Sequence, residues 1–427
     1  MNYSIALLII GILSVQYTLA QNPKDYISGF FYKMDISAYQ GGEYQFTARA
    51  KSDTLSPNAG SYLYVRMDGE KDNLLSYQGS ETPIQKHQWE TYSIRGKINK
   101  KAKSILVGGQ CLFQGKYFFD DFVLKVRTKN GSWKDFNLPN SDFGVNQKNH
   151  TSQRFTLPEQ CTVSVQEIAD KTKPLVVDAS QIIVHGFNDQ AGKYLTCRNV
   201  TFYYETYGEG EPLLLLHGNA QSIKDYAAQI PVLAKKYKVI AVDTRGHGKS
   251  TEDGTPLSYN LFAEDMLAFI DHLKIEKVNV LGWSDGGNTA LIMAMKAPEK
   301  INKLAVMGAN LYNDKTSVLP EINSQLRKRI KVIEKKNLAD TFEGRLLYLL
   351  RDEPNINPED LTKIDCPTLV MVGENDYFFK SHTRLIAEKI NNAQLVVFVD
   401  GTHEEPIKNP DRFNATVLSF LEEKKVN

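Results

Sequence analysis

The stretch from Val278 to Gly287, V-N-V-L-G-W-S-D-G-G, decides the fold of this chain. Apolar and β-branched residues lead to a serine, Ser284, that is enclosed by Gly282 and Gly286. The pattern G-x-S-x-G is typical of a strained turn between a strand and a helix, where larger side chains would collide with their neighbours. The stretch therefore predicts a serine hydroxyl at the N-terminus of a helix, where backbone N–H groups are free. A Gly/Ser turn in another kind of α/β protein is the alternative.

Continuous apolar runs recur on both sides of this stretch. They cover residues 213–217, 237–243, 277–283, 304–308, 368–373 and 394–399. An entry hairpin is predicted at residues 194–208, and residues 261–273 carry apolar side chains at helical spacing. Strands that are apolar on both faces belong to a parallel sheet covered by helices. The sequence therefore predicts a doubly wound α/β domain over residues 192–427, with its site beyond the carboxyl ends of the strands.

Two residues that can activate a serine follow later strands. A serine hydroxyl is a poor nucleophile at neutral pH, so a base must take its proton and a carboxylate must orient that base. Asp376 follows the fifth apolar run in V-G-E-N-D, and His403 follows the sixth in V-D-G-T-H. Because these strands end at one edge of the sheet, we predict a catalytic triad of Ser284, Asp376 and His403. Glu374 is the alternative acid.

A tetrahedral oxyanion also needs hydrogen-bond donors. The tripeptide H-G-N ends at Asn219 and follows the first apolar run. The backbone N–H groups of Asn219 and Asp285 are therefore predicted to form the oxyanion hole. The carboxylate of Asp285 also suits the positive end of the helix dipole. His217 and His247 are interpreted as structural residues, since loop histidines often bond to the backbone.

Residues 192–427 resemble the α/β-hydrolase superfamily. The matching motifs stand in family order: H-G-N, A-V-D-T-R-G-H-G-K-S, G-W-S-D-G-G, C-P-T-L-V-M-V-G-E-N-D and G-T-H. Within it, G-W-S-D-G-G-N-T-A-L-I with the later G-A-N-L-Y is similar to the valacyclovir hydrolase (biphenyl hydrolase-like) group. This resemblance implies ester hydrolysis, α-amino acid esters included, with Asp285 as the candidate for holding a substrate ammonium. Asn219 is a departure, because relatives often carry a bulky apolar residue there.

The part of the chain before residue 166 has a β texture. Short alternating segments separated by turn residues predict an antiparallel sandwich over residues 21–165. The phrases G-x-Y-x-F-x-A-x-A, W-x-x-Y-S and F-F-D-D-F-x-L-x-V resemble jelly-roll modules of the carbohydrate-binding and galactose-binding-like type, so a carbohydrate is a candidate ligand of this module. Four aromatic residues are interpreted as core rather than as a sugar platform: Tyr62, Tyr64, Trp89 and Tyr92.

Two further segments and three single residues are assigned from their place in the sequence. Residues 166–191 are predicted to be a linker, because they show weak periodicity. Residues 311–362 interrupt the order of the strands and are predicted to form a small helical cap over the serine. Asp243 and Arg245 are interpreted as tying the loop after their strand, and His382 is placed on a solvated helix start.

The N-terminal residues indicate export. Residues 5–15 are almost entirely apolar yet too short to span a bilayer, and T-L-A at 18–20 supplies the small residues of a cleavage site. We predict a signal peptide over residues 1–20, a secreted or periplasmic location and no span after cleavage. Because residues 1–4 contain no Lys or Arg, a permanent anchor is the alternative.

Composition bounds the partners and cofactors. The 427 residues suit two domains. Lys and Arg total 51 and Asp and Glu total 50, so no net field favours a nucleic acid. Four cysteines permit disulfides in an exported protein, but no C-x-x-C or Cys/His cluster indicates zinc. The sequence therefore predicts no metal and no cofactor.

Together these features predict an exported serine hydrolase that cleaves carboxylic esters through an acyl-enzyme on Ser284. Its substrate would be a small-molecule or glycan-linked acyl ester. Serine at this position disfavours epoxide hydrolase and haloalkane dehalogenase chemistry, which the superfamily carries out with Asp there. The alternatives are an amidase or aminopeptidase-type enzyme, a polysaccharide-deacylating esterase on the same triad, and a non-catalytic glycan-binding protein.

Overall fold

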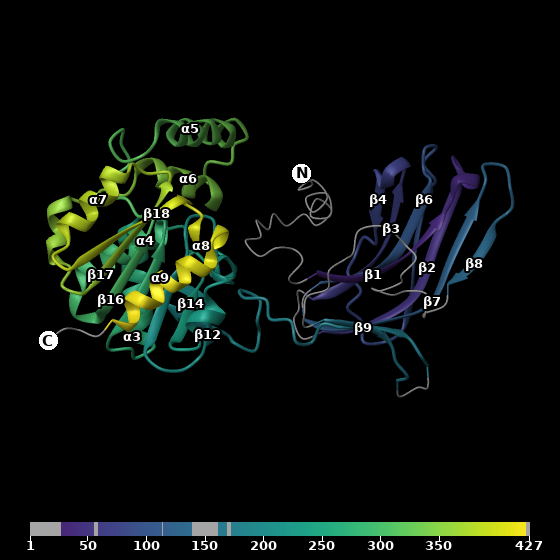
Figure 1. The fold of residues 1–427 in the computed structure, drawn as a ribbon, viewed down its shortest axis with the longest axis horizontal. Helices are drawn as coiled ribbons and strands as arrows, with labels where there is room; N and C mark the ends of the chain where they lie inside the picture. The colour runs from purple at the N-terminus through teal and green to yellow at the C-terminus, as the bar shows by residue number, and fades with distance from the viewer. Residues whose placement is uncertain (1–26, 55–58, 113, 139–160, 169–171, 424–427) are drawn as a thin grey trace. The chain divides into compact units, whose positions relative to one another are not determined.

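The chain divides into two compact units, residues 1–187 and 188–427. The computed structural model describes residues 27–54, 59–112, 114–138, 161–168 and 172–423 (Figure 1). The predicted signal peptide lies outside these residues. Each unit has its own hydrophobic core.

The first unit is built from antiparallel strands. They are β1 (Ile27–Asp35), β2 (Glu43–Thr54), β3 (Gly60–Asp68), β4 (Leu74–Gly79), β5 (Glu90–Lys97), β6 (Ser104–Leu112), β7 (Gly115–Arg127), β8 (Lys134–Leu138), β9 (Thr162–Val165) and β10 (Leu175–Asp178). One sheet has the order β1-β6-β3-β4. The other has the order β5-β2-β7-β10-β9, with β8 also pairing with β7.

The two sheets pack face to face around an aromatic core. Phe30 of β1 lies edge-on to Phe119 and Phe122 of β7, with ring centroids 4.7 and 5.6 Å apart. Strand β2 alternates buried and partly exposed residues, as expected for a sheet with one buried face. This arrangement is a β-sandwich. Tyr64 is buried as predicted, whereas Tyr62, Trp89 and Tyr92 are only partly buried.

The prediction of a linker over residues 166–191 differs from the structure. Residues Leu175–Asp178 form β10, which pairs with β7 on one side and with β9 on the other. Leu175 and Val177 are buried in the sandwich core. The segment is only four residues long, so its alternation was too short to identify it as a strand.

The second unit contains one eight-stranded sheet. Its strands are β11 (Gly192–Cys197), β12 (Val200–Tyr207), β13 (Pro212–Leu216), β14 (Lys238–Val242), β15 (Val278–Trp283), β16 (Ile301–Met307), β17 (Thr368–Asn375) and β18 (Ala393–Thr402). The order is β11-β12-β14-β13-β15-β16-β17-β18. Strands β11 and β12 pair antiparallel and form the predicted hairpin, and β12 also pairs antiparallel with β14. All other neighbours in this sheet, from β14 to β18, pair parallel.

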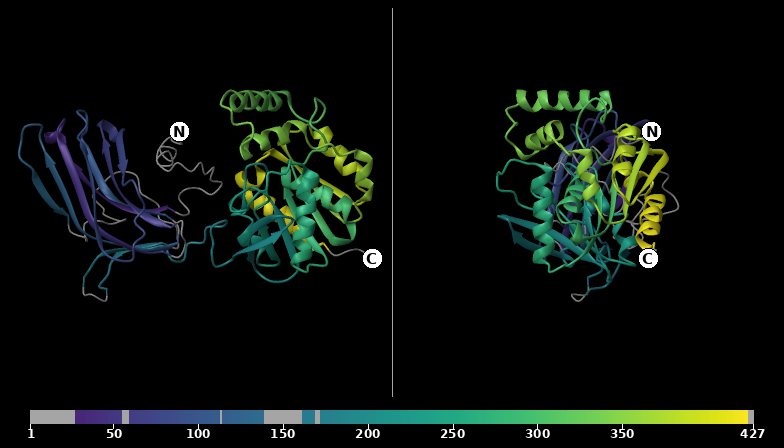
Figure 2. Two further views of the ribbon diagram at one scale, coloured as in Figure 1. Left: turned by 180° about the vertical axis from the view of Figure 1, so that it is seen from behind. Right: turned by 90° about the vertical axis from the view of Figure 1, so that its left-hand side faces the viewer.

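Helices cover both faces of this sheet, as the doubly wound prediction requires (Figures 1 and 2). They are α2 (Ile230–Leu233), α3 (Tyr259–His272), α4 (Asp285–Lys296), α5 (Pro320–Lys335), α6 (Phe342–Asp352), α7 (Lys380–Lys389), α8 (Glu405–Lys408) and α9 (Pro410–Glu422). Helices α3, α4 and α7 share one core cluster, and α2 and α9 share the cluster on the opposite face. Short 3-10 helices cover Ser37–Tyr39, Glu70–Asp72, Ile223–Tyr226, Pro298–Lys300 and Pro358–Lys363.

Helices α5 and α6 occupy the segment that was predicted as a cap. They lie between β16 and β17 in the chain, and Figure 1 shows α5 outermost in this unit. Leu347 of α6 packs against Ile330 and Ile333 of α5. Among the residues that the structure describes, no helix is long and apolar enough to cross a membrane. The four cysteines are buried.

Candidate active site

Ser284 stands at the turn between β15 and α4. Its backbone has φ 56° and ψ −118°, a left-handed conformation that is unfavourable for a residue with a side chain. A Cβ at Gly282 would lie 2.3 Å from the carbonyl oxygen of Gly286, and a Cβ at Gly286 would lie 1.9 Å from that of Leu216. Both distances are well below contact, so the two glycines permit the turn.

The structure brings the three predicted triad residues together. The hydroxyl Oγ of Ser284 is 2.9 Å from Nε2 of His403, and Nδ1 of His403 is 2.7 Å from Oδ1 of Asp376. An ionised carboxylate only accepts hydrogen bonds, so Nδ1 carries the hydrogen and Nε2 is left to accept from the serine. Glu374 is exposed, pairs with Lys380 and does not reach the imidazole.

The acid and the base are both held by their surroundings. Asp376 is buried at the end of β17, where its carboxylate also accepts from the backbone N–H of Tyr377 at 2.6 Å. The ring of Tyr377 stacks on the imidazole of His403 with centroids 4.3 Å apart. Trp283 donates its indole N–H to the carbonyl of His403 at 2.8 Å. Sequence reasoning did not identify Tyr377 or Trp283, because only the fold brings them to the histidine.

The predicted oxyanion donors lie beside the serine. Asp285 is the first residue of α4, so its N–H has no partner within the helix, and the side chain of Asn219 reaches its carboxylate at 2.9 Å. No described residue accepts a hydrogen bond from the backbone N–H of Asn219 or of Asp285. Both donors are therefore available to an anionic oxygen.

The side chain of Asp285 is a buried acid next to the nucleophile. It is 5% exposed and accepts hydrogen bonds from the amide of Asn219 at 2.9 Å and from the hydroxyl of Tyr259 at 2.8 Å. Within the described part of the chain, no Lys or Arg forms an ion pair with it. Burial raises the pKa of Asp285 above the ordinary value for an aspartic acid. Tyr259 was not identified from the sequence, since it lies on α3, away from the strand ends.

The other histidines are structural. Nδ1 of His217 is 2.8 Å from the carbonyl of Gly218, and its Nε2 accepts from the backbone N–H of Thr244 at 3.1 Å. Burial lowers the pKa of His247 to about 4. The prediction that His382 is solvated is wrong. Its side chain is buried, and its Nε2 accepts a hydrogen bond from the backbone N–H of Leu311. The contact joins residues 71 positions apart, which no local pattern reveals.

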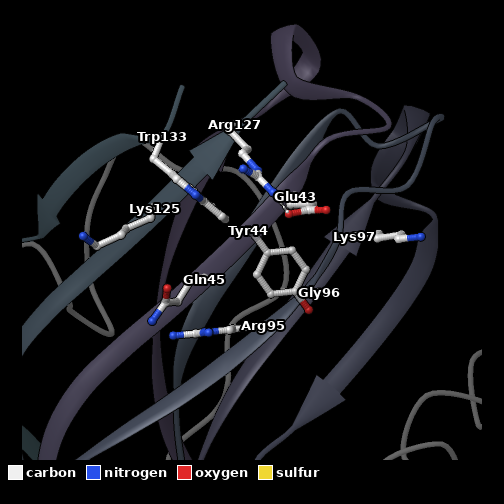
Figure 3. A pocket seen from close by; sticks show the side chains of 9 residues that line it. All are labelled: Glu43, Tyr44, Gln45, Arg95, Gly96, Lys97, Lys125, Arg127 and Trp133. Carbon is white, nitrogen blue, oxygen red and sulfur yellow. Dashed lines mark hydrogen bonds and ion pairs between the residues drawn. The ribbon is translucent and has the colours of Figure 1, made fainter. Parts of the chain in front are cut away.

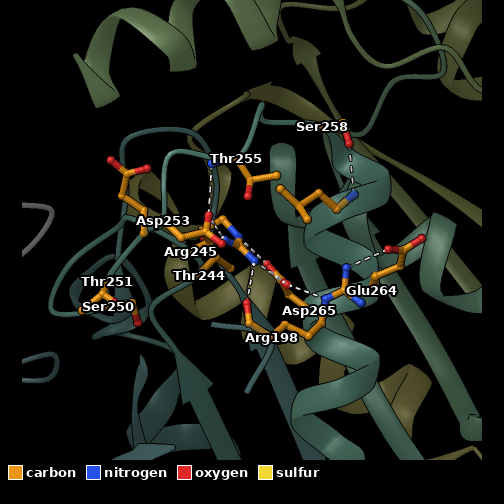
Figure 4. Close-up of polar contacts among 12 residues, drawn as sticks. Arg198, Thr244, Arg245, Ser250, Thr251, Asp253, Thr255, Ser258, Glu264 and Asp265 are labelled. Atoms are coloured by element: carbon orange, nitrogen blue, oxygen red, sulfur yellow. Dashed lines mark hydrogen bonds and ion pairs between the residues drawn. The ribbon is translucent and has the colours of Figure 1, made fainter. Parts of the chain in front are cut away.

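A buried ion-pair cluster holds the loop after β14. The guanidinium of Arg245 donates to the two oxygens of Asp265 at 2.7 and 2.9 Å and to Asp253 at 2.6 Å (Figure 4). Arg198 also donates to Asp265, at 3.0 Å. Asp243 accepts from the backbone N–H of Lys249 within the same loop and from that of Ile223, at the start of the 3-10 helix that follows β13. The interpretation of Asp243 and Arg245 as loop-tying residues is confirmed. In the portion that the structure describes, no cluster of His, Cys, Asp and Glu is arranged to hold a metal ion.

The chain is similar in sequence to known proteins. Residues 211–347 match the family described as alpha/beta hydrolase fold. The chain is 30% identical over 278 residues to serine hydrolase BPHL of Mus musculus, which covers 59% of this chain and 93% of that protein. It is 28% identical over 265 residues to 2-hydroxy-6-oxononadienedioate/2-hydroxy-6-oxononatrienedioate hydrolase 1 of Pseudomonas putida, with 52% and 92% covered. Among solved structures, the enol-lactonase from Burkholderia xenovorans LB400 matches with 23% identity and a TM-score of 0.47, over 54% of this chain and 100% of that one.

Proposed function

The chain belongs to the α/β-hydrolase family and is a hydrolase, and from that premise we propose that it is an exported serine hydrolase that cleaves carboxylic esters. The observation that carries the proposal is the continuous hydrogen-bond path from Ser284 through His403 to Asp376. Export rests on the apolar residues 5–15 and the small residues at 18–20, which lie outside the described residues.

In the first step Ser284 attacks the ester carbonyl. Its proton passes to Nε2 of His403, and Asp376 holds the opposite nitrogen and stabilises the imidazolium. The N–H groups of Asn219 and Asp285 donate to the oxyanion that forms. The imidazolium then gives its proton to the departing alcohol, which leaves the acyl group on the serine oxygen.

In the second step water removes the acyl group. His403 takes a proton from the water as its oxygen attacks the acyl carbonyl, and then returns a proton to the oxygen of Ser284. The carboxylic acid is released and the enzyme regains its starting state. Besides the ester, water is the one reactant that the two steps consume.

We expect a serine-directed fluorophosphonate to label the folded protein at Ser284 alone. The reagent needs an activated oxygen nucleophile, and among the described residues only this serine lies against an imidazole that is oriented by a carboxylate. Peptide mass spectrometry of the labelled chain measures the site. Protein unfolded by heat before mixing is the control and should stay unlabelled. A label on another serine, or none at all, would contradict the assignment.

We further propose that the enzyme prefers esters whose acyl part carries an ammonium group. Asp285 supports this, since it is a buried carboxylate one residue from the nucleophile with only neutral hydrogen-bond partners. A buried charge of this kind is costly unless a cation neutralises it. A substrate ammonium would supply that cation. The first-turn position at the helix N-terminus gives the carboxylate only part of this compensation.

The substitution Asp285→Asn tests this preference. It is expected to raise KM for the p-nitrophenyl ester of valine by roughly 30-fold, about 2 kcal/mol, because a charge pair is lost. The isovaleryl ester has the same shape without the ammonium and should change little. Since the pKa of Asp285 is raised, the preference should weaken in the native enzyme as the pH falls and the carboxyl takes up its proton.

The control for this experiment is Asp271→Asn. Asp271 lies on α3 with its carboxylate largely exposed, so its loss removes the same charge without touching the site. The backbone N–H of residue 285 persists in the test variant, which keeps the oxyanion hole intact. Equal changes for the valine and isovaleryl esters would refute an ammonium site and leave the esterase proposal standing.

A further inference from the structure

The β-sandwich carries a groove that the hydrolase chemistry does not use. It has a volume of about 660 Å³ and is open to solvent on the face of β5, β2 and β7 (Figure 3). The residues that line it are Glu43, Tyr44, Gln45, Arg95, Gly96, Lys97, Lys125, Arg127 and Trp133. All of them belong to the first unit, so the groove is complete within the sandwich.

Cationic side chains flank the groove on two strands. In the sheet register, Glu43 of β2 stands between Lys97 and Arg127, and Gln45 stands between Arg95 and Lys125. Neighbouring strands are about 4.8 Å apart, and alternate residues on one face are about 7 Å apart. The four cations therefore mark the corners of a patch of about 7 by 10 Å, a size that suits an extended chain rather than one small ion.

The patch keeps an excess of positive charge. Arg127 binds Glu43 through two nitrogens, at 2.6 and 3.1 Å, and Lys125 pairs with Asp135 at 2.8 Å. Arg95 and Lys97 form no ion pair with any described carboxylate. Two exposed cations at one side of the groove are therefore available to an anionic ligand.

Trp133 forms the wall at the opposite side. Its side chain is 40% exposed, and the guanidinium of Arg127 lies 4.7 Å from the centre of its ring. The arginine contact fixes the indole and leaves part of it open to the groove (Figure 3). A flat aromatic surface beside polar and cationic groups can stack on one unit of a polymer while the charges bind its neighbours.

We propose that this groove binds an acidic polysaccharide, whose carboxylate or sulfate groups pair with Arg95 and Lys97 and one of whose sugar rings packs on Trp133. Charge complementarity favours an anionic polymer, and the central amide of Gln45 suits hydroxyl groups. A nucleic acid fits less well, because one indole offers no succession of stacking surfaces and the whole chain has a balanced charge. Binding here would hold the enzyme on a polymer that bears acyl groups, a role that rests on the proposed esterase function.

The test uses the full chain with Ser284→Ala, so that binding is measured without turnover. Affinity electrophoresis and calorimetry with polygalacturonate, dextran sulfate and neutral dextran as probes should give binding to an acidic polymer and none to dextran. The carboxylated and sulfated probes distinguish the two anion types. Rising salt should weaken the binding, since exposed charges are screened. In the same background, Arg95→Ala with Lys97→Ala should weaken it at least about tenfold.

The matched control is Lys86→Ala with Lys116→Ala. These lysines lie on the same unit, at the other ends of the β5 and β7 region, and do not line the groove. Trp133→Ala should also weaken binding, and Trp133→Phe should restore much of it. Circular dichroism verifies the fold of each variant. Equal loss in the control pair, tighter binding to single-stranded DNA than to either polysaccharide, or no binding to any probe would overturn the proposal, whatever the esterase assays give.

Discussion

Ser284→Ala is expected to lower kcat for p-nitrophenyl esters by roughly 10⁴- to 10⁶-fold, to a residual rate that the oxyanion hole and binding alone supply. The physical reason is that, in the part of the chain that the structure describes, no other hydroxyl lies against Nε2 of His403. Stopped assays with short acyl chains measure the loss. The substrate's KM should change much less, since the serine oxygen is a small part of the binding surface.

A matched serine gives the control for this experiment. Ser381 lies exposed on α7, and Ser381→Ala should retain full activity. Because the side chain of Ser284 makes no helix-capping hydrogen bond, its alanine variant should unfold at nearly the native temperature. A kcat close to the native value in a folded Ser284→Ala protein would exclude the acyl-enzyme mechanism.

Arg245→Met is expected to cost about 3–5 kcal/mol of the free energy of unfolding of the second unit. Arg245 is 2% exposed and supplies two hydrogen bonds to Asp265, whose side chain is 1% exposed. Methionine fills a similar volume but leaves a buried carboxylate largely uncompensated, which is the costly way to break such a pair. Trp283, the one tryptophan of the second unit, reports the transition by fluorescence during urea unfolding.

Arg198→Met is the control for this prediction. Arg198 donates to the same carboxylate but its side chain is 39% exposed, so solvent screens the contact. Its loss should cost no more than about 1 kcal/mol. If both variants lost the same stability, burial would not be what gives the Arg245 contact its strength.

The strand ends explain why the triad was predictable. Each apolar run that was read as a core strand ends within a few residues of its observed limit, and parallel strands bring such ends to one edge. Ser284, Asp376 and His403 follow three of those ends, so local patterns and a general rule of α/β sheets were enough to group them. The motif D-T-R-G-H-G also follows a strand end, and the role of Asp243 and Arg245 in holding the loop after that strand was predicted from it.

Residues placed by distant contacts were not predictable. Tyr259 donates to Asp285 from helix α3, and the ring of Tyr377 stacks on that of His403. His382 is buried and accepts a hydrogen bond from the backbone N–H of Leu311, far away in the sequence. In the sandwich, Trp133 stands in no alternating segment, so nothing in its sequence context relates it to β2 or β5. Strand register decided its neighbours, and register is fixed by pairing across the whole sheet.

The close backbone contacts of Gly282 and Gly286 also limit how descendants of this chain can diverge. Any side chain at either position would strike a carbonyl oxygen, so a single substitution would disturb the backbone before it altered the chemistry. New substrates are therefore reached more easily by changes at Asn219, at Asp285 or in helices α5 and α6 than by changes at the two glycines. The nucleophile stays fixed while its surroundings vary, which is how one scaffold can supply many different hydrolases.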